Sequence, residues 1–165
     1  MDALVTTQWL EGELSAPDLR ILDTTWFLPA EGRDAHAEFL AEHIRGAAFF
    51  DINAIADPSS PLPTMLPPPE QFGAQLGALG VATGSRIVLY DNAPHHTATR
   101  AWWMLRSFGI DAAILDGGLA KWKAEGRPLL SGEPASAPAT VAGRPNPSLV
   151  RALEQVGATL LSHVA

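Results

Sequence analysis

Short apolar runs that stop at an aspartate divide the chain at intervals. Four such runs are present, at Leu19–Leu22, Ala47–Phe50, Arg86–Tyr90 and Ala112–Leu115. The residues that close them are Asp23, Asp51, Asp91 and Asp116. Apolar runs of this length, bounded by polar residues, are typical of buried strands. We therefore predict four strands, each followed by a carboxylate.

Helical periodicity fills the intervals between these runs. Apolar residues recur every three or four positions in residues 33–43, 69–79, 97–108 and 119–125, and a first helix is expected at Thr7–Glu13. Pro69 suits a first helical turn, and Thr97 is expected to cap the helix that it opens. Strands and helices therefore alternate along the chain.

This alternation predicts an α/β domain with a largely parallel sheet and helices on both faces. Strands that are apolar throughout agree with a sheet that is covered on both sides. In such folds, binding and catalytic groups lie in the loops after the carboxyl ends of the strands. The strand-end aspartates therefore mark the edge at which a site is expected.

Two proline-rich segments interrupt the alternation. Residues 57–69 hold six prolines, which predicts an extended excursion without helix or strand. Residues 129–147, rich in Pro, Ala, Gly and Ser, are interpreted as a linker. A further amphipathic helix is expected at 148–161, in an order that repeats the start of the chain. We therefore expect a domain at residues 1–128, the linker, and at 148–165 the first helix of a truncated second domain.

Composition narrows the chemistry. The 165 residues carry a formal net charge of −7 and no cysteine. A chain without cysteine has no disulfide, no thiolate ligand and no thiol nucleophile, and its acidic balance argues against nucleic acid as a partner. No secretory signal or apolar stretch of about 18 residues is evident, so we expect a cytoplasmic protein that does not contact membranes.

The loop after the third predicted strand is the candidate site. It contains Asp91, Asn92, His95, His96, Thr97 and Arg100, and it leads into a helix N-terminus, where free N–H groups favour anions. A metal site at the two histidines is disfavoured because adjacent residues point in different directions. Arg100 is either an anion ligand or, more simply, an ion-pair partner of Asp91 or of another strand-end carboxylate. We expect neither a metal nor a cofactor.

Two neighbouring tryptophans follow in the same helix. Helix positions one residue apart differ by about 100° in direction, so Trp102 and Trp103 face different surroundings. We expect Trp102 in the core, and Trp103 together with Arg106 at a contact between domains.

Three segments resemble the rhodanese family. They are His43–Ile52, the stretch Val88–Asp91 with Arg100–Gly109, and Leu115–Gly118 with Lys121, Trp122, Glu125 and Gly126. The resemblance is to the amino-terminal, non-catalytic half of the two-domain sulfurtransferases. It implies that Asp91 occupies the position of the nucleophilic cysteine, so the loop is vestigial and no residue of this chain is catalytic.

The resemblance also implies a function. Sulfane sulfur from thiosulfate or 3-mercaptopyruvate would pass through a cysteine persulfide of a second rhodanese domain to a thiol or cyanide. Small anionic sulfur donors and that missing carboxyl-terminal domain are then the expected partners, and the chain is expected to be inactive alone. The alternative is a stand-alone, catalytically inactive module that binds an anion or a partner protein.

Overall fold

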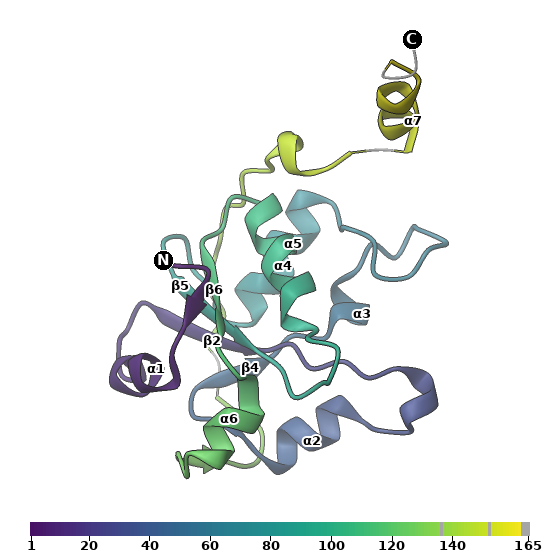
Figure 1. Ribbon diagram of the computed structural model, residues 1–165. Helices are drawn as coiled ribbons and strands as arrows, with labels where there is room; N and C mark the ends of the chain where they lie inside the picture. Colours follow the sequence, from purple (N-terminus) through teal and green to yellow (C-terminus); the bar gives the residue numbers. More distant parts are fainter. Residues whose placement is uncertain (136, 152, 163–165) are drawn as a thin grey trace.

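A computed structural model describes residues 1–135, 137–151 and 153–162 (Figure 1). The elements in chain order are β1 (Leu4–Val5), α1 (Thr7–Glu13), β2 (Leu19–Asp23), η1 (Pro29–Glu31), α2 (Ala35–Ala41), β3 (His43–Ile44), β4 (Ala47–Phe49), α3 (Ile52–Ile55), α4 (Pro69–Ala78), β5 (Arg86–Tyr90), α5 (Ala98–Ser107), β6 (Ala112–Leu115), α6 (Gly118–Ala124), β7 (Leu129–Leu130), η2 (Pro147–Leu149) and α7 (Leu153–Ser162). The four predicted strands and five predicted helices of residues 1–128 are all confirmed, with small shifts at their ends.

The central sheet is parallel throughout. Its strands lie in the order β1-β6-β5-β2-β4, and Ile21 of β2 lies opposite Val88 of β5. The shortest strand, β1, completes one edge by pairing Leu4 with Ile114 of β6. Because all strands run in one direction, the loops after β2, β5 and β6 gather at one edge of the sheet.

Two hydrophobic clusters lie on opposite faces of this sheet, because successive strand residues point to opposite sides. Ile87 and Leu89 belong to the cluster under α3, α4 and α5, whereas Val88 and Tyr90 belong to the cluster under α1, α2 and α6. Figure 1 shows these two groups of helices on either side of the sheet. The expected α/β architecture with helices on both faces is therefore confirmed.

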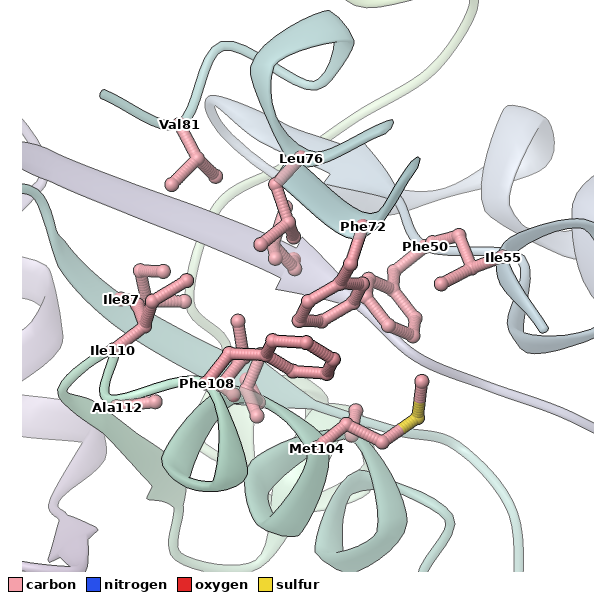
Figure 2. Close-up of a cluster of buried hydrophobic side chains, with 14 of the residues drawn as sticks. Phe50, Ile55, Phe72, Leu76, Val81, Ile87, Met104, Phe108, Ile110 and Ala112 are labelled. Carbon is pink, nitrogen blue, oxygen red and sulfur yellow. The ribbon is translucent and has the colours of Figure 1, made fainter. Parts of the chain in front are cut away.

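Aromatic packing defines the first cluster (Figure 2). The rings of Phe72 on α4 and Phe108 at the end of α5 have centroids 4.5 Å apart. Phe50, Leu76 and Met104 surround them and are fully buried. The contact between α4 and α5 is thus made through large apolar side chains.

Polar side chains define where several helices begin. The hydroxyl of Thr6 accepts the Trp9 N–H at the start of α1, and the Asp34 carboxylate accepts the Ala37 N–H at the start of α2. Asp51 does the same for α3, which the periodicity did not predict because it has only four residues. Each cap satisfies an N–H that has no partner within its helix.

Parts of the chain beyond residue 128 contact the domain. β7 pairs with β3 in a small antiparallel sheet, and the Gly132 N–H donates to the Leu40 carbonyl. The division at residue 128 stays a prediction, but described residues of the segment predicted as a linker are bonded to the domain.

The predicted helix 148–161 was wrong at its start. Residues Pro147–Leu149 form a 3₁₀ turn, Val150 and Arg151 are not helical, and α7 spans Leu153–Ser162 of the described residues. The side chain of Leu160, expected on the apolar face of that helix, lies outside the described residues, as do 163–165. Within the described part of the chain, no helix is both long and apolar enough to cross a membrane.

Candidate functional site

A cavity of about 640 Å³ opens at the carboxyl edge of the sheet. Its walls are the start of the predicted site loop (Asp91, Asn92, Ala93, Pro94), His96, Ala98 and Thr99 beyond it, the turn after β6 (Asp116, Gly117, Gly118), and Leu4, Arg33, Ile114, Leu115 and Ala120. The cavity thus lies at the edge of the sheet at which the sequence pattern predicted a site.

Asp91 lines this cavity directly after β5, and only 8% of the residue is exposed. One carboxylate oxygen, Oδ2, accepts the Ala98 N–H at 2.7 Å, so the side chain caps α5. The Asp91 carbonyl accepts the Leu119 N–H at 2.9 Å from the first turn of α6. Thr97 is the N-cap residue as predicted, but its side chain makes no cap hydrogen bond, because the Thr97 hydroxyl donates to the Thr24 carbonyl instead. The positive end of α5 therefore already faces an anion of the protein itself.

The turn after β6 is shaped by the same carbonyl. Gly117 and Gly118 have φ of 80° and 55°, a backbone conformation that glycine adopts without strain and that makes the turn into α6 tight. A Cβ on Gly118 would lie 2.5 Å from the Asp91 carbonyl oxygen. The two loops can approach this closely only because residue 118 has no side chain.

A polar network beneath the loop joins β2 to β5. Asp23 is 2% exposed, and its Oδ1 accepts hydrogen bonds from the Thr25 N–H at 2.9 Å and the Thr25 hydroxyl at 2.5 Å. The Thr25 hydroxyl oxygen in turn accepts the Asn92 N–H at 3.0 Å. Asn92, part of the predicted loop, is thereby tied to the end of β2.

Burial raises the pKa of the Asp23 carboxyl, and the nearby Asp91 carboxylate adds to the rise. Hydrogen bonds from Thr25 and from the Tyr90 hydroxyl act in the opposite direction. Burial also raises the pKa of the Tyr90 phenol well above its usual value. Sequence reasoning did not place Asp23 in the site, although its position at a strand end was a signal for it.

The two histidines of the loop make different contacts. The His95 ring meets Trp26 edge-on, with centroids 5.9 Å apart, and its Nδ1 lies 4.0 Å from Oε1 of Glu31. His96 has φ of 54°, and its carbonyl accepts the Thr99 hydroxyl. Among the described residues, no three His, Asp or Glu side chains are grouped as a metal site would require.

Arg100 faces away from the strand-end carboxylates. Its Nη2 donates to the Thr64 carbonyl at 2.5 Å, and the guanidinium lies 4.6 Å from the centre of the Trp103 ring. Burial lowers the pKa of this guanidinium. The expected ion pair with Asp91 was wrong, since no carboxylate of the described residues lies within ion-pair distance of Arg100. Arg100 instead ties the proline-rich excursion to α5.

Both tryptophans of α5 are partly buried. Trp102 and Trp103 pack against the cluster shown in Figure 2, and the Trp102 indole donates to the Ala112 carbonyl at 2.8 Å. Arg106 covers Trp102 and forms an ion pair with Asp111 at 3.0 Å. Trp102 therefore contacts the core, but it is only partly buried and Trp103 packs against the same cluster, so the expected difference in surroundings was wrong. The contact between domains proposed for Trp103 and Arg106 stays a prediction.

Comparison with known proteins shows which family and which sequences the chain resembles. Residues 6–125 match the rhodanese-like domain family. The chain is 42% identical to human 3-mercaptopyruvate sulfurtransferase over 97% of its own length and 56% of the relative's. It is 38% identical to thiosulfate sulfurtransferase of Bos taurus, over 93% of this chain and 54% of that protein.

The fold has a close counterpart among solved structures. The crystal structure of SseA from Escherichia coli, described as having the rhodanese fold, superposes with a TM-score of 0.89 at 37% sequence identity. The match covers 99% of this chain and 62% of SseA. The chain thus spans about half the length of the curated relatives that it matches.

Proposed function

The chain belongs to the rhodanese-like domain family, and from this premise we propose that it is the amino-terminal, non-catalytic half of a two-domain 3-mercaptopyruvate or thiosulfate sulfurtransferase. The observation that carries the proposal is the match of nearly the whole chain to about half of each relative. The second half, which supplies the reacting cysteine, is the proposed partner.

The chemistry of the edge supports a non-catalytic role for this half. Sulfur transfer by a persulfide needs a thiolate, and a helix N-terminus stabilises such an anion. Here the full chain has no cysteine, and the Asp91 carboxylate occupies the N-terminus of α5. A second anion at this helix end would meet repulsion from Asp91. The proposed task of this half is therefore to support the reacting domain.

In the proposed reaction, the cysteine thiolate of the second half attacks the outer sulfur of thiosulfate or the sulfur of 3-mercaptopyruvate and becomes a persulfide. The S–S bond of thiosulfate breaks and sulfite leaves, or the C–S bond of 3-mercaptopyruvate breaks and the enolate of pyruvate leaves and takes up a proton. The persulfide then gives this sulfur to a thiol or to cyanide, and the thiolate is restored. The described residues of this chain supply the scaffold and the loops next to that centre, and none of them forms or breaks a bond.

Sulfur transfer assays test the proposal. The 165-residue chain, purified alone, should transfer no sulfur from either donor to cyanide or to a thiol. The same chain extended by its continuing reading frame should be active, with a persulfide on a cysteine beyond residue 165 detected by mass spectrometry. Turnover by the short chain that a change at Asp91 abolishes would contradict the proposal. A reading frame that continues without a cysteine-bearing domain would favour the stand-alone binding module.

A further inference from the structure

An extended segment, residues 139–146, lies along α4 and α5, and we call it the belt. Five hydrogen bonds join it to the domain: Ala139 N–H to the Gly77 carbonyl (2.8 Å), Thr83 N–H to the Thr140 carbonyl (3.1 Å), Ala142 N–H to the Thr83 hydroxyl (3.2 Å), Arg144 N–H to the Phe108 carbonyl (2.7 Å) and Asn146 N–H to the Ser107 carbonyl (2.7 Å). Residues 139–146 run along the domain toward the end of α5 (Figure 1). The belt is thus bonded to the domain from its first residue to its last.

Glycines on α4 and just after α5 make room for the belt. A Cβ on Gly77 would lie 2.3 Å from the Ala139 carbonyl oxygen, and one on Gly73 would lie 3.0 Å from the Val141 carbonyl oxygen. At the end of α5, a Cβ on Gly109 would lie 2.8 Å from the Arg144 carbonyl oxygen. Because backbone atoms cannot yield as a flexible side chain can, only a residue without a side chain fits at Gly77 and Gly109, whereas a side chain at Gly73 would require the belt to shift slightly.

One side chain anchors the belt in the core. Val141 is 9% exposed and belongs to the same cluster as Phe72 and Phe108. Figure 2 shows these two rings, one from each helix, facing each other. The belt residues around Val141 are small: Ala139, Thr140, Ala142 and Gly143. The surface that the belt covers on α4 and at the end of α5, which we call the groove of α4 and α5, therefore fits an extended stretch of small residues with one branched apolar side chain.

We infer that the groove of α4 and α5 is a binding site for an extended peptide, occupied by this chain's own residues 139–146. The occupied groove holds the two helices together, and the chain leaves the domain at Pro147. If residues 129–147 formed a free, flexible linker, the root-mean-square distance between its two ends would be roughly 25 Å, and the position of its far end would vary over that range. The belt instead fixes the point from which any following domain starts, next to the end of α5. This inference goes beyond the proposed function and does not depend on sulfur transfer.

Hydrogen exchange of the full 165-residue chain tests the inference. In the wild type, the amides of Ala139, Ala142, Arg144 and Asn146 should be protected. Gly77→Ala should make these amides exchange at least about tenfold faster, because its methyl group displaces the Ala139 carbonyl. Gly12→Ala is the matched control: it also lies within a helix, but a Cβ there meets nothing within 4 Å. Its exchange in the belt should equal that of the wild type.

A second variant covers the case in which Gly77→Ala fails to fold. Thr83→Val removes the hydroxyl that accepts the Ala142 N–H and leaves both helices unchanged, so exchange at Ala142 should rise. The inference is overturned if the four wild-type amides exchange as fast as those of an unstructured peptide. Belt exchange in folded Gly77→Ala and Thr83→Val proteins that equals that of the wild type would overturn it as well.

Discussion

Asp23 holds an ionisable group in the protein interior, where the charged form is disfavoured. Its carboxyl is 2% exposed, and burial is the largest cause of its raised pKa. A group whose pKa is higher in the folded state binds its proton more tightly there. Its contribution to stability is therefore complete below the unfolded pKa, near 3.8, and is lost as the pH rises through the folded pKa.

Asp23→Asn should accordingly stabilise the protein at neutral pH. The amide oxygen can still accept the two hydrogen bonds from Thr25, and no charge has to be buried. The gain in the urea midpoint should be largest at neutral pH and should shrink toward pH 4. Asp18→Asn is a control of opposite sign, since a hydrogen bond from Arg86 lowers the pKa of that exposed carboxyl. A pH-independent effect of Asp23→Asn would contradict this account.

The Asp91 carboxylate acts as a helix cap, which predicts a cost for its removal. Asp91→Ala leaves the Ala98 N–H without its acceptor and should lower the free energy of unfolding by about 0.5–2 kcal/mol. Asp91→Asn keeps an acceptor oxygen and should lose less. Denaturant titrations of the three proteins measure the difference. Equal stability of the alanine and wild-type proteins would show that the cap contributes nothing.

The sequence predicted the position of Asp91 but not its hydrogen bond. Local rules favour the residue just before the helix as its cap, and they selected Thr97. The actual cap lies seven positions before the N–H that it accepts, and it reaches the helix only because the loop folds back on β5. The ion pair predicted for Arg100 was wrong for a similar reason. The partner of Arg100 is the Thr64 carbonyl, and Thr64 lies in the proline-rich excursion, whose path no sequence pattern indicates.

At the scale of elements, the start of α6 and the loop after β5 pack against each other at Gly118. Gly118→Ala should destabilise the protein both through its φ of 55° and through contact with the Asp91 carbonyl. Gly126→Ala provides the control, because φ there is 68° but a Cβ meets nothing within 4 Å. We expect the control to cost about 1 kcal/mol and Gly118→Ala at least about twice as much, measured as free energy of unfolding. Equal costs would show that the contact is absent.

Long elements were predictable and very short ones were not. The predicted limits of β5 and β6 agree with the structure because each run is apolar and ends at a polar residue. β1, β3 and β7 have two residues each, too few for a pattern, and each exists only through a partner far along the chain. Tertiary pairing, absent from any local window, decides such elements.

For the whole molecule, alternation of strands and helices was sufficient to predict the layered architecture. It was not sufficient to predict the fate of residues 129–146. Their content of Pro, Ala and Gly resembles that of a linker, and the glycines that accommodate them lie some 35 to 70 positions earlier, on α4 and after α5. Composition describes only the segment itself, whereas docking depends on the surface that receives it.

The pairing of β1 with β6 has a consequence for how the protein folds. The first strand cannot join the sheet until β6 is made, and the amino group of Met1 meets Asp111, 110 positions along the chain. Contacts this distant in sequence slow folding, because a long loop must close first. During synthesis, β2, β4 and β5 can therefore assemble before β1 has a strand to pair with. The newly made chain exposes an unpaired sheet edge until residues 112–115 arrive.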